Sequence, residues 1–326
     1  MKRKMYDAVG IDMPCIDLNI NMETYPKQGR GGSVKQLSWQ GGGKAATGMV
    51  ASARLGAKCA MMGCVGDDVF GDFIIKDFKR HGIDTDAMKV GKTETSAIGI
   101  VLSDYETGNR TILYRNGSVP GLTSADLDFE IIRSSKYLFI CGAGEAVYEA
   151  VKAARMAGTL VLVDADGYTE EMLRLIPQID VFIGSEFFYG QMFGAKITED
   201  CHEKNCRKVK EMGPGIAVFT LGEKGCVGVG PEGYFRLPAF KVDVSDTVGA
   251  GDVFHGAYLA GLVKGQNAET AARFASGAAA IKCTRIGGRA AIPDEKTLDR
   301  FLTDGYIDFS EIDERVKFYE RGLENV

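Results

Sequence analysis

Asp252 is the residue best placed for acid–base chemistry, because it follows a turn of three small residues, Gly249, Ala250 and Gly251. An apolar stretch that predicts a helix begins directly after it. The unshielded N–H groups of such a turn and the positive end of the helix dipole form an anion site suited to a phosphoryl group in transit. The dipole also predicts that Asp252 is ionised at neutral pH and able to accept a proton. Taken alone, these residues fit a purely structural turn equally well.

A second glycine-rich segment, Gly41–Thr47, also precedes an apolar helical pattern. It resembles a phosphate-binding loop, but Ser38 stands where the first glycine is required, and Ala45 follows Lys44 where Ser or Thr is required. The segment therefore predicts only a tight turn that opens a helix and lets a ligand approach the backbone closely.

A third segment, Gly142–Val147, follows a predicted strand and opens a predicted helix. The next strand ends at Asp164, which is about the right distance away for an acid that binds a ribose. Against a dinucleotide site, Val147 stands where a third glycine is wanted. An NAD-dependent oxidoreductase that uses Gly142–Gly144 is therefore the alternative function from a different class.

The elements that must position these segments follow from the hydrophobic pattern, in which short apolar runs alternate with helical periodicity. Strands are predicted over residues 6–11, 59–64, 137–141, 159–164, 181–184, 217–221 and 240–244, and helices over residues 45–55, 69–80, 146–157 and 268–281. This order predicts an α/β fold with a parallel sheet and helices on both of its faces.

Two stretches interrupt that pattern, at about residues 18–40 and 93–118, and both are typical of antiparallel β structure. In the second, strands over Ala97–Ser103 and Arg110–Arg115 flank a polar connection that ends in Gly108 and Asn109. We expect these stretches to form a small β-sheet lid that closes over a ligand and excludes water.

The bulk composition excludes several classes of protein. With 326 residues, 45% of them hydrophobic, and a net charge of −5, the chain is typical of one large globular domain with a smaller appendage. Its charge does not suit a nucleic-acid partner, and it contains no apolar run long enough to span a membrane. Eight cysteines, several of them in predicted core strands, indicate reduced buried thiols, so we expect a cytoplasmic protein.

From about Tyr6 to Pro293 the chain resembles the ribokinase (pfkB) family of carbohydrate kinases. The most specific likeness is Asp246–Leu259, which meets a family signature at every position. Gly42–Lys44, Gly63–Gly71 and Thr220–Gly225 are similar to further family segments in order and spacing. The resemblance implies a ribokinase-like, three-layer Rossmann-like α/β sandwich. It implies a single kinase domain over residues 1–326, with the β-lid built from about residues 18–40 and 93–118.

The implied activity is transfer of the γ-phosphoryl group of ATP to a hydroxyl, usually primary, of a small sugar or sugar derivative. By this resemblance Asp252 takes the hydroxyl proton, and the N–H groups of Gly249, Ala250 and Gly251 hold the phosphoryl charge. A loose transition state asks mainly for positioning and charge stabilisation, which suits such a site. A nucleoside kinase of the same fold and a non-catalytic sugar or nucleotide sensor remain alternatives.

The resemblance also implies binding residues. The substrate-binding set is Asp17, Gly42, Gly43, Lys44, Thr47, Asn116 and Glu145, with Asp12 as an alternative to Asp17. The nucleotide-binding set is Ser185, Thr220, Gly222, Gly225, Thr247, Gly249 and Gly251. Mg²⁺ is implied through the nucleotide, with Glu186 as its candidate protein ligand, and a monovalent cation such as K⁺ is a further expected cofactor. A homodimer that forms through the β-lid is the expected assembly.

Three departures from the family pattern qualify these expectations. Thr47 replaces an asparagine that contacts the sugar in the family, which argues against ribokinase itself. The family's Asn-x-x-Glu element is Ser185–Phe188 here, with Glu186 beside the missing acid. Asp166 also replaces an asparagine and restores a carboxylate near the expected metal. The acceptor is left open, although Lys44 and Arg115 would suit an acidic sugar.

Overall fold

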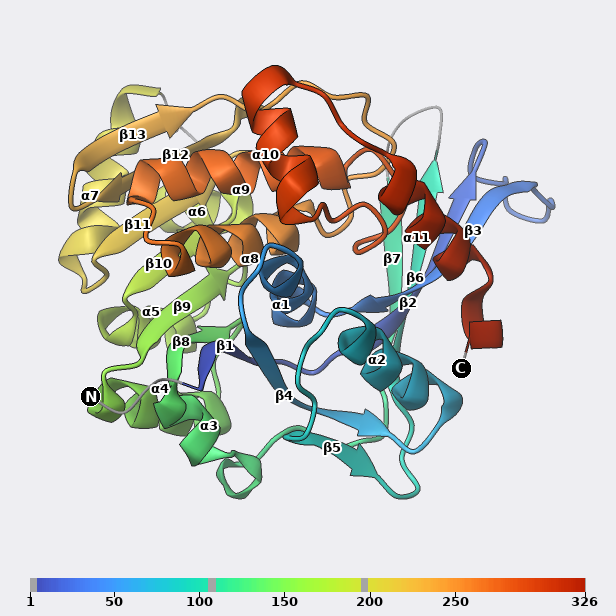
Figure 1. The fold of residues 1–326 in the computed structure, drawn as a ribbon, viewed down its shortest axis with the longest axis horizontal. Helices are drawn as coiled ribbons and strands as arrows, with labels where there is room; N and C mark the ends of the chain where they lie inside the picture. Colours follow the sequence, from blue (N-terminus) through green and yellow to red (C-terminus); the bar gives the residue numbers. More distant parts are fainter. Residues whose placement is uncertain (1–4, 105–109, 195–198, 326) are drawn as a thin grey trace.

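The central sheet of the protein has helices on both faces (Figure 1). The computed structural model describes residues 5–104, 110–194 and 199–325, and within them this sheet has nine strands in the order β13-β12-β11-β10-β9-β8-β1-β4-β5. All neighbouring strands are parallel except the pairs β11–β12 and β12–β13. The strands are β1 (Tyr6–Ile11), β4 (Cys59–Gly66), β5 (Met88–Gly91), β8 (Ser135–Ile140), β9 (Leu160–Ala165), β10 (Val181–Gly184), β11 (Ile216–Thr220), β12 (Cys226–Gly230) and β13 (Gly233–Leu237).

Alternate residues of the strands supply two separate hydrophobic cores, one on each face of the sheet. Ala8 of β1 belongs to one core and Val9 to the other. The first core packs against α1 (Lys44–Arg54), α2 (Val69–Arg80), α8 (Ala250–Val263), α9 (Ala268–Lys282), α10 (Glu295–Asp304) and α11 (Ser310–Glu320). The second packs against α3 (Phe129–Ser134), α4 (Glu145–Ala157), α5 (Glu170–Leu175), α6 (Glu186–Phe193) and α7 (His202–Glu211). The protein is therefore a three-layer α/β/α sandwich.

Local sequence signals account for several helix boundaries. The side chain of Asp68 caps α2 by accepting a hydrogen bond from the N–H of Gly71 at 2.8 Å, and Asn267 caps α9 in the same way through Thr270. The residues of α8 are apolar on nearly all sides of the helix. This composition suits its burial, since every residue of Val253–Gly261 is buried. Single turns of 3₁₀ helix lie at Ser124–Asp126, Ile176–Gln178, Glu199–Cys201, Gly222–Lys224 and Gly322–Asn325.

A second, four-stranded sheet projects from the sandwich on the side of α2 and α11 (Figure 1). Its order is β3-β2-β6-β7, formed by β2 (Cys15–Met22), β3 (Val34–Gly42), β6 (Ala97–Asp104) and β7 (Arg110–Arg115). The pairs β2–β3 and β6–β7 are antiparallel, whereas β2 and β6, which come from different hairpins, are parallel. Two segments far apart in the sequence are thus joined in one sheet.

A buried cluster that we call the anchor cluster joins this second sheet to the sandwich; it consists of Asp77, His81, Arg289 and Tyr319. The Asp77 carboxylate accepts hydrogen bonds from Arg289 Nη1 and from the Tyr319 hydroxyl, each at 2.7 Å. His81 Nε2 lies 2.9 Å from the same hydroxyl. Arg289 also donates to the carbonyl oxygen of Gly42 at the end of β3 (3.0 Å). Every charge in the cluster has a close partner.

The prediction of a strand over residues 240–244 is wrong. The described backbone from 238 to 244 forms neither a strand nor a helix. The apolar alternation there has another cause, because Phe240 and Val242 pack at the margin of the first core, with the Phe240 ring 5.2 Å from that of Phe301. The other predicted strands and helices are present with boundaries shifted by one or two residues at most. No helix among the described residues is long and apolar enough to cross a membrane.

Candidate active site

Most of the candidate catalytic side chains come together at the carboxyl ends of the parallel strands, where open α/β sheets bind ligands. Asp12 follows β1, Asp164 is the next-to-last residue of β9, and Asp166 is the first residue after that strand. Lys44 begins α1 and Asp252 lies in the first turn of α8. We call Asp12, Lys44, Asp164, Asp166 and Asp252 the catalytic cluster.

Close contact between α1 and α8 brings the start of each helix to this edge of the sheet. A side chain at Gly256 would place its Cβ 1.9 Å from the carbonyl oxygen of Gly48, so only glycine fits at this crossing. Ser52 of α1 also donates to the carbonyl oxygen of Gly256 at 2.8 Å. The spacing of small residues in the two helices therefore sets where Lys44 and Asp252 lie relative to each other.

The turn before Asp252 has the conformation that its glycines allow. Gly249 has φ +73° and its missing Cβ would lie 2.9 Å from Gly288, so glycine is required there on two grounds. Asp246 fixes the turn by accepting hydrogen bonds from the N–H groups of Val248 (2.9 Å) and Gly287 (2.8 Å). By contrast, a Cβ at Gly251 would meet no protein atom within 4 Å. The packing leaves open space in front of Gly251, where a ligand can approach the backbone.

The electrostatic environment of Asp252 differs from the sequence-based expectation. Burial and the nearby Asp164 raise the pKa of Asp252 well above its usual range, although the Lys44 ammonium opposes this. The helix dipole alone favours the opposite direction, toward the ionised carboxylate. The burial of Asp252 and its neighbouring carboxylates depend on tertiary contacts, which no local motif reveals.

Lys44 supplies positive charge to the catalytic cluster. Its ammonium group forms an ion pair with the carboxylate of Asp166. Burial alone would raise the pKa of Asp166, but the hydrogen bond and charge of Lys44 outweigh it and lower that pKa. For Asp164 burial dominates and raises its pKa, although His255 and Lys44 oppose the shift. The cluster thus holds four carboxyl groups around one lysine.

His255 has a structural role behind the turn that precedes Asp252. Its Nδ1 lies 2.6 Å from the carbonyl oxygen of Gly251, and its Nε2 lies 3.2 Å from the carbonyl oxygen of Ile183. The same Nε2 is 3.5 Å from Asp164. The ring therefore links α8 to β9 and β10 behind the turn.

The two carboxylates expected as alternatives for substrate binding, Asp12 and Asp17, differ in their partners. Asp12 accepts a hydrogen bond from the N–H of Ala46 at 2.9 Å, so it already serves the first turn of α1. Asp17 lies between two glycines, Gly42 and Gly99, where a Cβ would approach its oxygens to 2.3 and 2.2 Å. Burial raises the pKa of Asp17. The Asp17 carboxylate fits between these glycines only because neither has a Cβ atom.

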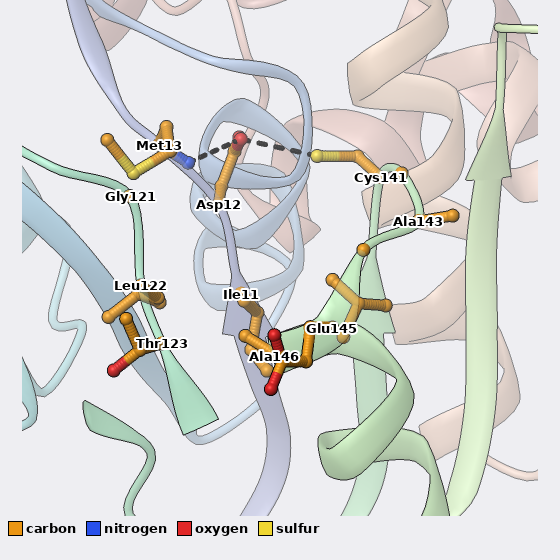
Figure 2. A pocket seen from close by; sticks show the side chains of 13 residues that line it. Ile11, Asp12, Met13, Gly121, Leu122, Thr123, Cys141, Ala143, Glu145 and Ala146 are labelled. Carbon is orange, nitrogen blue, oxygen red and sulfur yellow. Dashed lines mark hydrogen bonds between the residues drawn. The ribbon is translucent and has the colours of Figure 1, made fainter. Parts of the chain in front are cut away.

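The remaining predicted substrate residues are not all brought together. Gly43 has φ +98° and precedes α1 beside Asp12. Thr47 is 2% exposed and its hydroxyl lies 3.3 Å from Arg289 Nε, so it faces the anchor cluster. Asn116 is exposed just beyond β7. Glu145 begins α4 and, with Asp12, Cys141 and Gly142–Gly144, lines a cavity of about 340 Å³ next to the catalytic cluster (Figure 2).

Four of the seven predicted nucleotide-binding residues follow or end β10 and β11, whereas Thr247, Gly249 and Gly251 lie in the turn before α8 or at its start. Ser185 caps α6 through the N–H of Phe188 (3.1 Å). Thr220 ends β11, and its hydroxyl is 3.5 Å from the carbonyl oxygen of Gly184. Gly222 and Gly225 both have positive φ in the turn that follows. These four predicted residues therefore form one surface, separate from Asp17 and Gly42.

Glu186 lies at the edge of that surface and pairs with Lys224 at 3.7 Å, both side chains being exposed. Among the described residues, no three His, Cys, Asp or Glu side chains form a group that could hold a metal ion. Mg²⁺ does not need such a cage in kinases, because it keeps several waters and takes one or two carboxylates together with substrate phosphates. Glu186 and Asp166, on adjacent strand ends, are a donor set of that kind.

Arg110 is a site residue that the sequence did not reveal. It opens β7 in the four-stranded sheet and donates to the hydroxyl of Thr247, in the turn before Asp252, at 2.6 Å. The two residues are separated by 137 positions in the sequence. The only available signal was an arginine directly after a predicted hairpin loop.

Comparisons with known proteins agree with this geometry. The chain is 29% identical over 325 residues to a 5-dehydro-2-deoxygluconokinase of Shouchella clausii, covering 93% of this chain and 98% of the relative. Its structure matches a ribokinase of Thermotoga maritima with a TM-score of 0.77 and 27% identity, covering 92% of this chain and all of that one. A ribokinase of Arabidopsis thaliana, solved with ribose and ATP, shares the fold with a TM-score of 0.79 and 24% identity, over 91% and 99% of the two chains.

The ribokinase-like fold expected from the sequence is thus confirmed, and kinase relatives argue against the dinucleotide-binding alternative at Gly142–Gly144. The pfkB family of carbohydrate kinases matches residues 4–295, which include both the catalytic cluster and the four-stranded sheet. The chain belongs to the pfkB family of carbohydrate kinases and is an ATP-dependent sugar kinase.

Proposed function

We propose that Asp252 is the catalytic base of this sugar kinase. The observation that carries the proposal is its place in the first turn of α8, directly after the open backbone at Gly251 and beside Lys44. A sugar hydroxyl oxygen attacks the γ-phosphorus of ATP, and the bond from that phosphorus to the bridging oxygen of ADP breaks. The hydroxyl proton passes to Asp252. A raised pKa makes its carboxylate a better proton acceptor once it is ionised.

The turn itself supports the phosphoryl group. The N–H groups of Gly249, Ala250 and Gly251 lie at the positive end of α8, where they stabilise the charge on the group in transit. Arg110 adds a guanidinium group to this turn from the four-stranded sheet through Thr247. In this proposal the sheet is a lid, and the contact between Arg110 and Thr247 is its closed position.

Substrates then bind on two sides of the turn. Asp17, Gly42 and Gly43 hold the sugar on the side of the lid, and Lys44 offsets the negative charge of the catalytic cluster. ATP lies along Ser185, Thr220, Gly222 and Gly225. Mg²⁺ would be held by the phosphates with Glu186 and Asp166, where it would neutralise charge on the phosphates.

The acceptor is a small sugar or sugar derivative. The described cations near the turn, Lys44 and Arg110, together with Arg115 on β7, make an acidic sugar the first class to test. A panel of neutral sugars, sugar acids and nucleosides is incubated with ATP and Mg²⁺, and sugar-dependent ADP formation is measured with identification of the phosphorylated product. Phosphorylation of one sugar class is expected. Phosphorylation of nucleosides alone would contradict the proposed acceptor.

We also propose that two copies pair through their lids. The edge strand β7 exposes Ile112, Leu113 and Tyr114, each more than half accessible. An exposed apolar edge strand is a surface that proteins usually cover. Light scattering is expected to give a dimer for the wild-type chain and a monomer for Ile112→Asp. A wild-type monomer, or a dimer unchanged by the substitution, would contradict this assembly.

A further inference from the structure

Lys282 is a fully buried lysine directly behind the turn that precedes Asp252. It is the last residue of α9, and 0% of its surface is exposed. Its ammonium group donates to the carbonyl oxygen of Asp246 at 2.8 Å. Asp246 is the residue whose carboxylate fixes the turn through Val248 and Gly287.

The partners of this ammonium are unusual for a buried charge. Ion pairs described for this structure do not include Lys282, and its nearest partner is a backbone carbonyl. The negative end of α9 also faces it, because Lys282 closes that helix. Burial lowers the pKa of Lys282, whereas the charges of Asp246 and Asp252 oppose that change. A carbonyl oxygen and the negative end of a helix both favour a cation at this position.

Keeping the Lys282 ammonium group buried is energetically unfavourable, so its charge at this position needs a physical explanation. Burying an ammonium group without a carboxylate partner is unfavourable, because the group loses its hydration and gains no full counter-charge. A neutral side chain of similar length at this buried position would not carry that penalty. The turn next to Lys282 would carry the negatively charged phosphoryl group, and a positive charge is useful there.

We propose that Lys282 is a built-in monovalent cation of the phosphoryl-transfer site, which holds the Asp246–Gly251 turn and adds positive charge behind it. This inference rests on the proposed function of that turn. It replaces the expectation of a K⁺ cofactor, because the ammonium group already supplies a positive charge at the Asp246 carbonyl oxygen behind the turn. Lys282 is a positioning residue, since it acts through Asp246 and does not touch the reacting atoms.

The test compares Lys282→Ala, which leaves a cavity, with Lys282→Met, which fills the space without a charge. Activity and the affinity for a non-hydrolysable ATP analogue are measured in tetramethylammonium buffer and after addition of K⁺ or NH₄⁺ at constant ionic strength. We expect wild-type protein to be indifferent to K⁺. Lys282→Ala should lose about 10- to 100-fold in kcat and regain part of it with NH₄⁺ or K⁺, whereas Lys282→Met should lose activity without recovery.

Ile281→Ala is the matched control, because it removes a neighbouring buried side chain of the same helix and no charge. It should lower the melting temperature without creating a response to K⁺ or NH₄⁺. The melting temperature of Lys282→Ala should rise with those ions more than that of wild type, which tests the cation site independently of any sugar. This readout also separates failure of the inference from failure of the proposed function.

Three results would overturn the inference. The first is activation or thermal stabilisation of the wild-type protein by K⁺ beyond its effect on Ile281→Ala. The second is equal behaviour of Lys282→Met and wild type. The third is a Lys282→Ala protein that loses stability and activity together and gains neither from added cations, which would make Lys282 a structural anchor. If Lys282→Ala does not fold, the wild-type and Lys282→Met measurements still decide between these outcomes.

Discussion

The anchor cluster and the catalytic cluster are both buried groups of charged residues, but they are compensated to different degrees. In the anchor cluster, burial alone would raise the pKa of Asp77, yet the charge of Arg289 and the hydrogen bond from Tyr319 outweigh it and lower that pKa. In the catalytic cluster the balance is reversed, and the pKa of Asp252 is raised. The charges of the anchor cluster are compensated within the protein, whereas that of Asp252 in the catalytic cluster is not.

This difference separates structure from function without reference to any motif. A buried charge whose partners are all present contributes to the fold and to its specificity. Carboxyl groups that crowd a single lysine at the end of a sheet destabilise the ligand-free protein, and such sites are where perturbed pKa values indicate function.

The largest effect is expected from Asp252→Asn, which removes the proton acceptor and keeps the shape of the side chain. We expect kcat to fall by about 10²- to 10⁴-fold, the usual contribution of a general base. Affinity for ATP should change little. Steady-state kinetics and calorimetry with an ATP analogue measure the two quantities. Asp243→Asn, an exposed acid before the same turn, is the control and should be fully active, whereas near-normal kcat in Asp252→Asn would refute its role.

In the anchor cluster, Asp77→Asn should destabilise the protein instead. It leaves the buried Arg289 guanidinium without its carboxylate, which costs about 3–5 kcal/mol in comparable buried pairs. Urea unfolding measures the loss, with Asp72→Asn on the exposed face of the same helix as the control. Folded Asp77→Asn protein should keep a kcat far above that of Asp252→Asn. A large fall in kcat with unchanged stability would place Asp77 in catalysis.

The sequence predicted much more of the turn than of its surroundings. The segment from Asp246 to Leu259 specifies a turn and helix through small and apolar residues close in sequence, and the structure contains both. The cap at Asp68 likewise set the first turn of α2. Glycine-rich β12 and its neighbour β13 were not predicted, because a segment such as Cys226–Gly230 has little of the usual strand composition.

What the sequence did not reveal depends on contacts between distant residues. Arg110 meets Thr247 across 137 positions, and Arg289 meets Asp77 across 212. The raised pKa of Asp252 also comes from its neighbours in space, since the local dipole alone predicts the opposite direction. Local patterns therefore locate the reactive segment, whereas its charge state is a property of the tertiary structure.

A pH-dependent effect on the stability of the anchor cluster is also expected. Burial lowers the pKa of His81 to about 3, so the folded protein keeps a neutral ring while an unfolded histidine gains a proton near pH 6.5. The unfolded state then binds more protons, and stability falls as pH decreases from about 6.5 toward 3, by up to about 1.4 kcal/mol per pH unit from this group. Urea unfolding at several pH values should show this slope, and His81→Gln should flatten it. An equal slope in both proteins would exclude His81 as its source.

The smallest expected effect concerns the acidic side of the pH profile of kcat/KM, which we call the acid limb. Because Asp252 must be ionised to act, kcat/KM should fall as pH decreases through its raised pKa, so the limb lies above the ordinary aspartate value near 4. Lys44→Met removes the cation that opposes this shift and should move the limb upward by on the order of one pH unit, whatever it does to substrate affinity. Lys44→Arg keeps the charge and should leave the limb in place. If both variants shift it equally, the geometry of Lys44, and not its charge, determines the ionisation of Asp252.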